Sequence, residues 1–277
     1  MSAPTTTVAW IGGRWGTPEQ LQIPLADRGL QLADGLFETI WVEGGQPQLL
    51  EPHLRRWREG AELLGMAPPP AAPELEPLLQ EAISRAGGQG ALRLNWSRGD
   101  HRGRGIDLPD APPEATQHRL WLQLTPTQAT FTPLTAMVSR QETRNGSSLM
   151  SRCKTFAYGQ AIQARREAQR AGAQEALLRS ASGELCCAAT ANVLVQRQGR
   201  WLTPPLSSGC LPGVMRGRLL ELGLADEARL EAAAQPGDRW LLINSLSCRP
   251  LLTLEGQPLG DWPSAAADAE RLWRSLL

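Results

Sequence analysis

Short segments with alternating apolar and polar positions and longer segments with helical spacing follow one another along the chain. In the first half, alternation predicts strands at Val8–Ile11, Arg14–Trp15, Phe37–Val42, Leu92–Trp96 and Leu120–Leu124. The glycine pair at residues 12–13 predicts a hairpin between the first two strands. Apolar spacings of three and four residues predict helices at Glu51–Leu64 and Glu74–Ala86, on either side of the proline-rich residues 67–73.

The second half continues the same mixture of elements. Strands are predicted at Leu134–Ser139, Glu175–Arg179, Asn192–Gln196 and Trp240–Asn244, and helices at Thr155–Ala171, residues 211–221 and Ala265–Leu276. Residues 125–133, TPTQATFTP, have no periodicity and indicate an interdomain connection. We therefore expect an α+β protein with an N-terminal domain at residues 1–124 and a C-terminal domain at residues 134–277.

The composition narrows the range of partners. The 277 residues carry 28 basic and 28 acidic side chains, so the formal net charge is zero, and no basic tract is present. A nucleic-acid or membrane-surface partner therefore has no electrostatic support. The five cysteines lack the spacing of a zinc site and are expected to be reduced thiols. Without a signal peptide or a run of about 18 apolar residues, the sequence predicts a cytoplasmic protein that binds a small molecule and no metal.

Lys154 is the only lysine in the chain, and Tyr158, the only tyrosine, lies four positions downstream. A lysine amine can lose its proton and form a Schiff base with a carbonyl, which a guanidinium cannot do. On the predicted helix, Lys154 and Tyr158 would lie one turn apart and face the same space. The alternative is that a bias toward arginine left one lysine on a solvated helix start.

The sequence LPGVMR at residues 211–216 predicts the start of a helix. The first N–H groups of a helix have no partner within the helix and bind phosphate together with the helix dipole. The alternative is that Pro212 simply occupies a favoured position in the first turn.

Several motifs in this order resemble one enzyme family. They are DRG (27–29), DGLFET (34–39), HLRRW (53–57), KTFAY (154–158), GELCCAATAN (183–192), TPPLSSGCLPGVMR (203–216) and NSL (244–246). The chain resembles the class IV, fold-type IV pyridoxal-phosphate enzymes, which include branched-chain and D-amino-acid aminotransferases and 4-amino-4-deoxychorismate lyase. The resemblance implies a two-domain α+β fold, pyridoxal 5'-phosphate as the cofactor and a homodimer.

The resemblance also implies roles for particular residues. Lys154 would form the Schiff base and move protons, while Tyr158 would contact the 3′-oxygen of the pyridine ring. The phosphate would be held by the Arg56 side chain, the Val214 and Met215 amides and the Ser245 hydroxyl, and Asn192 would brace the hairpin beside the ring. From the residues alone, Arg56 could equally lie on a solvated helix face, Ser245 in a plain turn and Asn192 at a strand start.

Cys187 departs from the family pattern, in which a glutamate five residues before the asparagine pairs with the pyridine nitrogen. A thiol, with an ordinary pKa of about 8.5, carries little charge at neutral pH. Glu184 could take the glutamate's place only if the hairpin were shifted. With Cys187 there, the cofactor would be a poorer electron sink, and transamination would suffer more than a reaction that forms an aromatic product.

The loop SRGDHRGRGI at residues 97–106 resembles the lyase pattern. Arg104, and less directly Arg98, would then bind substrate carboxylates, unless this is a solvated loop of arginine and glycine. We therefore expect a lyase that converts 4-amino-4-deoxychorismate to 4-aminobenzoate and pyruvate for folate synthesis. The alternatives are an aminotransferase of D-amino or branched-chain acids, and a degenerate relative that acts as a binding protein.

Overall fold

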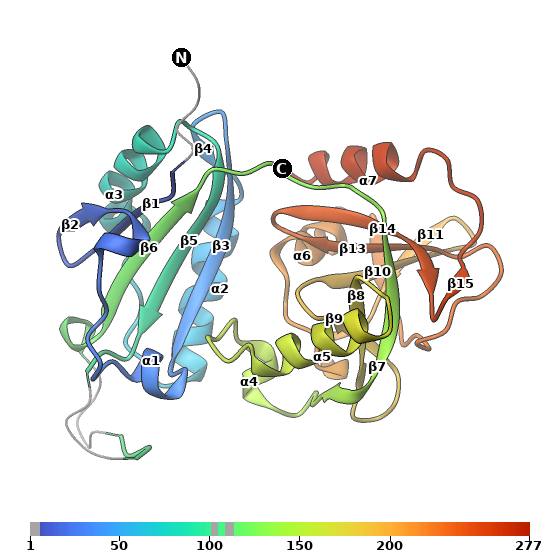
Figure 1. Ribbon diagram of the computed structural model, residues 1–277, viewed down its shortest axis with the longest axis horizontal. Coiled ribbons are helices and arrows are strands. Elements are labelled where there is room, and N and C mark those ends of the chain that lie inside the picture. Colours follow the sequence, from blue (N-terminus) through green and yellow to red (C-terminus); the bar gives the residue numbers. More distant parts are fainter. Residues whose placement is uncertain (1–5, 101–104, 109–113) are drawn as a thin grey trace. The chain divides into compact units, whose positions relative to one another are not determined.

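The computed structural model describes residues 6–100, 105–108 and 114–277, which form two compact units (Figure 1). The N-terminal unit comprises residues 1–128 together with Cys153–Ala157, and the C-terminal unit comprises the remaining residues, 129–152 and 158–277. The boundary near residue 128 lies within the segment predicted as a connection. Residues 153–157, which the sequence division assigns to the second domain, group instead with the first unit.

The N-terminal unit is built on an antiparallel sheet. Its strands, in spatial order, are β2 (Arg14–Gly16), β1 (Val8–Ile11), β6 (Arg119–Thr125), β5 (Gly90–Ser97), β3 (Gly35–Glu43) and β4 (Gln46–Pro47). Its helices are α1 (Arg28–Leu32), α2 (Leu50–Leu63) and α3 (Ala72–Arg85), and the short 3-10 turns are Pro18–Gln20 and Ala115–Gln117. Apart from β4, which was not predicted, the strands and the two longer helices lie within about three residues of their predicted bounds.

Alternation along β3 and β5 gives the sheet two different faces. Leu36, Ile40, Leu92 and Leu94 join the apolar core that also contains residues of α2 and α3. Because successive side chains of a strand point to opposite faces, Arg93 and the residues two positions before and after it point away from the core. The sheet therefore has one face in the core and one face that carries aromatic and polar groups.

The C-terminal unit contains a mixed sheet. Its strands, in spatial order, are β12 (Ala225–Glu227), β11 (Arg200–Thr203), β10 (Asn192–Arg197), β13 (Arg239–Asn244), β14 (Ser247–Leu254), β7 (Leu134–Arg144), β8 (Glu175–Ser180) and β9 (Leu185–Ala188), with β15 (Gln257–Pro258) paired to β14. The helices are α4 (Leu149–Arg152), α5 (Gly159–Arg170), α6 (Val214–Glu221) and α7 (Ala265–Arg274), with a 3-10 turn at Leu206–Ser208. The pairings of β7 with β8 and β14, and of β11 with β12, are parallel.

The predicted helix at Thr155–Ala171 starts too early. Helix α5 begins only at Gly159, because the preceding residues are bonded to the start of β3. Phe37 N donates to Lys154 O (2.9 Å), and Phe156 N donates to Gly35 O (3.0 Å). Lys154 is therefore on an extended segment, and the helical argument that sets it one turn from Tyr158 is wrong.

The cysteines and half of the ten tryptophans are buried. All five cysteines are buried and free of disulfides, as expected of reduced thiols. Trp41, Trp57, Trp240 and Trp273 are among the most deeply buried large side chains, in agreement with a packing role. In the part of the chain that the structure describes, no helix has the length and apolar character needed to cross a bilayer.

Candidate active site

The start of β3 positions Lys154. Thr155 forms a bridge to Leu36, so the lysine backbone lies beside the first residues of the strand. Its Nζ lies 4.4 Å from the centre of the Phe37 ring. A Cβ on Gly35 would come within 2.2 Å of the Phe156 ring. The glycine of DGLFET is thus required for the close approach of the segment that carries the lysine.

A second cation shares the Phe37 ring with Lys154. The guanidinium carbon of Arg93 lies 3.6 Å from the ring centre, and Arg93 Nε donates to Asn95 Oδ1 (2.7 Å). Sequence reasoning missed Arg93. The available signal was the strand sequence ALRLNW, in which arginine and asparagine occupy the positions that alternate with core leucines.

Glu38 is a buried carboxylate that joins β3 to α2. It is 1% exposed, accepts from Arg56 Nε (2.8 Å) and Nη2 (2.5 Å), and contacts His53 Nδ1 at 2.7 Å. Burial raises the pKa of Glu38, but the Arg56 charge and the hydrogen bond from His53 outweigh it and hold this pKa at about 2. Burial lowers the pKa of His53, so a neutral imidazole donates its Nδ1–H to the carboxylate.

This arrangement determines the orientation of Arg56. The bidentate bond to Glu38 fixes the guanidinium plane, and the Arg56 side chain is only 10% exposed. Arg56 therefore does not belong to the solvated helix face that the sequence left open. Sequence reasoning missed Glu38 and His53 as members of the site, although a glutamate inside an apolar strand is an informative signal.

Acidic residues of the DRG and DG motifs hold the loops around α1. Asp27 accepts from Leu30 N (3.3 Å), Ser97 Oγ (2.7 Å) and Arg119. Asp27 is fully buried, so these donors replace its hydration. The motif therefore has a structural part in bringing α1 and the end of β5 together.

Arg98 belongs to the same network. Its Nε donates to Asp34 Oδ2 (2.9 Å), and its Nη1 and Nη2 donate to the carbonyl oxygens of Gly65 and Leu64, both at 2.8 Å. These contacts brace the chain after β5 against the end of α2. Arg104 lies outside the described residues.

The first turn of α6 presents buried backbone donors. Val214 and Met215 are 9% and 2% exposed, and no side chain caps the helix at Gly213. Asn192 Nδ2 donates to Leu211 O (3.0 Å), and a Cβ on Gly213 would come within 2.0 Å of Asn192 Oδ1. Asn192 thus holds the segment that leads into α6, and only glycine fits beside it.

Cys187 lies in an apolar cluster with Met137, Ala164, Ala168, Ala176, Leu178, Cys186 and Cys210. Cys187 lies on β9 and pairs with Leu178 on β8, next to an irregularity in the register of the two strands. The hydrogen bond from Cys186 lowers the pKa of Cys187, against burial, with a further contribution from the Arg144 charge. The group beside Cys187 that carries a fixed positive charge is therefore Arg144, from β7.

Neighbouring glutamates are committed to other partners. Glu184 accepts from Ser208 Oγ (2.7 Å) and from Arg229 Nη1 (3.1 Å), and Glu175 forms an ion pair with Arg165. The contacts of Glu184 hold it at the β8–β9 turn, which gives no support to the shifted hairpin.

Two further candidates lie at element ends. Tyr158 is the residue that immediately precedes α5, and Ser245 lies in the turn between β13 and β14. In the NSL motif, Asn244 Oδ1 accepts from Leu246 N (2.9 Å) and Ser247 Oγ (3.0 Å), and its Nδ2 donates to Thr190 O (3.2 Å). Asn244, which the sequence reasoning missed, therefore ties this turn to the loop that precedes Asn192.

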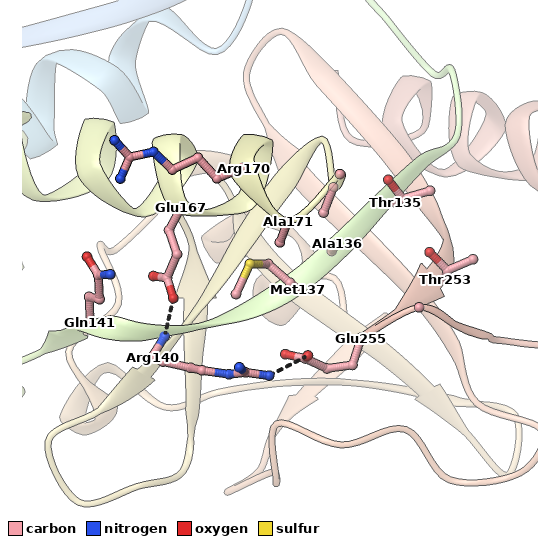
Figure 2. A pocket seen from close by; sticks show the side chains of 13 residues that line it. Thr135, Ala136, Met137, Arg140, Gln141, Glu167, Arg170, Ala171, Thr253 and Glu255 are labelled. Atoms are coloured by element: carbon pink, nitrogen blue, oxygen red, sulfur yellow. Dashed lines mark hydrogen bonds and ion pairs between the residues drawn. The ribbon is translucent and has the colours of Figure 1, made fainter.

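A cavity of about 570 Å³ in the C-terminal unit contains none of the candidate residues. Figure 2 shows Glu167 and Glu255 reaching toward Arg140, and each carboxylate is already engaged by the chain. Glu167 accepts from Arg140 N (3.0 Å), and Glu255 accepts from Val138 N (2.6 Å), where the pairing of β7 with β8 is interrupted. We assign no ligand to this cavity.

Comparison with known proteins identifies the family. The model of the class IV amino-transferases matches residues 35–252, so the chain belongs to this family. A Schizosaccharomyces pombe protein, whose name gives aminodeoxychorismate lyase as an unproven assignment, is 29% identical over 230 residues, which cover 79% of this chain and 90% of that protein. The D-alanine aminotransferase of Bacillus licheniformis is 26% identical over 267 residues, which cover 90% of this chain and 89% of that enzyme.

The fold has solved counterparts. A hypothetical aminotransferase from Mycobacterium tuberculosis, in its PLP-bound form, has a TM-score of 0.81 at 22% identity and covers 97% of this chain and 98% of that one. The predicted two-domain, fold-type IV α+β class is confirmed.

Proposed function

We propose that the protein is a pyridoxal-phosphate-dependent lyase that converts 4-amino-4-deoxychorismate to 4-aminobenzoate and pyruvate. The observation that carries the proposal is the association of the single lysine with a second cation, Arg93, on one aromatic ring. This arrangement provides an amine for chemistry beside a charge that attracts carboxylates. Family membership supports the cofactor, and one relative with a lyase name supports the reaction.

Each unit, taken by itself, offers donors that suit pyridoxal phosphate. The uncapped, buried start of α6 offers the Val214 and Met215 amides to a phosphate, and the arginine held by Glu38 offers a preoriented guanidinium. The Lys154 amine suits the aldehyde. We propose that Tyr158 and Ser245 add hydroxyl donors to the 3′-oxygen and the phosphate, and that Asn192 supports the ring side of the hairpin.

The bound cofactor supplies an electron sink for the carbon that bears the substrate amine. Lys154 then takes the proton from that carbon and delivers a proton to the enolpyruvyl group as its carbon–oxygen bond to the ring breaks. Loss of the enolpyruvyl group makes the ring aromatic, and the protonated group leaves as pyruvate. Because no amino group is transferred to an acceptor, the reaction needs no keto acid.

Cys187 favours the lyase over an aminotransferase. We propose that its thiol takes the place opposite the pyridine nitrogen, where a carboxylate would keep the nitrogen protonated. The apolar surroundings and the Arg144 charge both disfavour a protonated nitrogen there. Transamination depends on strong electron withdrawal and loses more from this change than a reaction driven by aromatisation.

We propose that Arg104 binds a carboxylate of the substrate, whereas the Arg98 guanidinium, which donates to Asp34 and to two carbonyl oxygens, has a structural part. We also propose that the protein works as a homodimer in the cytoplasm. Light scattering at micromolar concentration tests the dimer, and a monomer would contradict it.

The test supplies the purified protein and pyridoxal phosphate with aminodeoxychorismate, without a keto acid. We expect 4-aminobenzoate and pyruvate in equal amounts, and Lys154→Ala to lose both the activity and the visible absorption of the lysine-bound cofactor. Glutamate formed from an amino acid and 2-oxoglutarate, without 4-aminobenzoate, would favour the aminotransferase that the second relative's name supports. A protein with no visible band and neither activity would contradict the proposal and favour the degenerate relative that acts as a binding protein.

A further inference from the structure

We propose that Arg216 positions the first turn of α6 and makes it selective for the dianionic form of a phosphate. The proposal rests on the proposed function for the identity of the cofactor. It goes further by naming a buried charge that selects the ionisation state of the phosphate. The motif LPGVMR was predicted to act through its backbone amides, and its arginine had no assigned role. Arg216 is a positioning residue, which acts on the ligand through the Val214 and Met215 amides and through its own charge.

Arg216 is a buried cation in the first turn of a helix. It is 3% exposed and follows closely on the N-cap, Gly213, in a first turn that contains no acidic residue. Because the N-terminal end of a helix carries a partial positive charge, a cation is unfavourable there unless an anion is close. The start of α6 therefore combines two positive contributions, the helix dipole and the guanidinium, and both stabilise a bound anion.

Two contacts fix the guanidinium. Arg216 Nη2 donates to Pro204 O (2.9 Å), and the same nitrogen forms an ion pair with Glu227 on β12. The carbonyl oxygen of Pro204 also accepts from Cys210 Sγ (3.6 Å). Since Pro204 and Pro205 have no N–H to donate to a neighbouring strand, the chain is held there through its carbonyl oxygens. Arg216 thus ties the segment after β11 to α6 and fixes where the helix begins.

The charge of Arg216 is only partly balanced by its ion pair. The Glu227 side chain is 46% exposed, whereas the Arg216 side chain is 4% exposed, so water screens the carboxylate more than the guanidinium. Within the described part of the chain, Arg216 Nε is buried and has no hydrogen-bond partner. Burial of a charged donor without full compensation is costly, so this arrangement favours a second anion near the start of α6.

The ionisation of a phosphate monoester makes it the matching ligand. Its second pKa is about 6, so it carries between one and two negative charges near neutral pH. A buried cation beside the amides that bind the phosphate stabilises the second charge and lowers this pKa. The start of α6 is therefore suited to a dianionic phosphate monoester and less suited to an anion with a single charge.

The experiment measures how much the phosphate contributes to cofactor binding. The full-length protein, freed of cofactor, is titrated with pyridoxal 5'-phosphate and with pyridoxal, which lacks the phosphate. Because both probes offer the same aldehyde to Lys154, the ratio of their dissociation constants cancels the contribution of the lysine. We expect Arg216→Gln to lower the preference for the phosphorylated probe by about tenfold at pH 7 and to bind pyridoxal as the wild type does, while Arg216→Lys keeps most of the preference.

The partner residue distinguishes the charge of Arg216 from a structural link. Glu227→Gln keeps an acceptor for the guanidinium and removes the negative charge. We therefore expect it to raise the preference for pyridoxal phosphate by roughly two- to fivefold, in the opposite direction to Arg216→Gln. A purely structural pair would predict that both substitutions weaken the binding of both probes.

The matched controls are Arg200→Gln and Asp226→Asn. They break a neighbouring ion pair between β11 and β12 whose side chains are 64% and 50% exposed. Because water screens this pair, the preference for the phosphorylated probe should stay within about twofold of the wild type.

The pH dependence provides a second readout. As the phosphate becomes a dianion between about pH 5 and 7, the wild-type preference for pyridoxal phosphate should rise, and it should rise less in Arg216→Gln. Burial raises the pKa of the neighbouring Cys210 thiol to about 11, so this thiol stays neutral over the range.

Circular dichroism shows which variants are folded, and Glu227→Gln decides by itself if Arg216→Gln is not. A folded Arg216→Gln with the wild-type preference at every pH overturns the proposal, as does a Glu227→Gln that lowers the preference. None of these measurements uses aminodeoxychorismate. A wild type that shows the expected ratios but forms no 4-aminobenzoate therefore refutes the lyase reaction and leaves the role of Arg216 in place.

Discussion

At the scale of single residues, a carboxylate and a thiol that are both buried lie in different electrostatic surroundings. Glu38 keeps its charge in the interior because Arg56 and His53 surround it with donors. Cys187 lies among apolar groups and a second thiol, with Arg144 as its positive neighbour. The same burial that is offset at Glu38 thus favours a neutral group beside Cys187.

Replacing Cys187 with glutamate should change the balance of reactions. A carboxylate next to Arg144 would favour a protonated pyridine nitrogen, so we expect transamination to increase at least tenfold relative to 4-aminobenzoate formation. The measurement is glutamate produced from 2-oxoglutarate, with the visible spectrum recorded to show that cofactor is bound. Cys186→Ser, at the adjacent buried thiol, is the control and should leave the ratio near that of the wild type. An unchanged ratio in cofactor-loaded Cys187→Glu would refute the role given to this thiol.

At the scale of elements, a glycine at the N-cap of helix α6 and a glycine inside the helix should respond in opposite ways to substitution. Gly213 faces Asn192, and an added Cβ would collide with the amide oxygen at 2.0 Å. Gly217 lies inside the same helix, and its added Cβ would meet nothing within 4 Å. Gly213→Ala should therefore displace the first turn and weaken pyridoxal-phosphate binding by tenfold or more, whereas Gly217→Ala should be neutral or stabilise the helix by about 0.5–1 kcal/mol.

Cofactor affinity by fluorescence titration, with thermal unfolding in parallel, tests this pair. Combining Gly213→Ala with Asn192→Ala should recover part of the affinity, because the colliding oxygen is removed. If Gly213→Ala binds the cofactor as tightly as Gly217→Ala, the start of α6 does not hold the phosphate.

The sequence predicted elements whose regularly spaced apolar side chains pack into a single core. It missed elements that are held in place by pairing with strands distant in the sequence. Strand β3 and helix α2 contribute regular apolar positions to one cluster, and their predicted bounds are close to those observed. Strand β14 was missed because it carries proline and arginine and is held by β13 and β7. Lys154 could be singled out by its rarity, but its extended conformation depends on bonds to Gly35 and Phe37, which no local pattern reveals.

At the scale of the whole molecule, the formal net charge is zero, yet we expect the folding stability to depend on pH in acid. The chain has equal numbers of basic and acidic side chains, and many of its carboxylates are held by arginines. For Glu38, the pKa falls from an ordinary 4.5 to about 2 on folding. The folded state therefore binds fewer protons, and the stabilisation is complete above pH 4.5 and is lost as the pH falls toward 2.

Glu38→Gln should remove this part of the acid dependence. At pH 7 we expect a loss on the order of 3 kcal/mol in the free energy of unfolding, since the charge of Arg56 loses its buried partner. The difference from the wild type should shrink as the pH is lowered from 4.5 to 2, where the wild-type carboxyl also becomes neutral. Denaturant unfolding followed by circular dichroism at several pH values measures this difference.

Glu81→Gln, which breaks the half-exposed pair with Arg85, is the control and should cost under about 1 kcal/mol at every pH. A gap between Glu38→Gln and the wild type that stays constant down to pH 2 would mean that the ionisation of Glu38 is not the source of its stabilising effect.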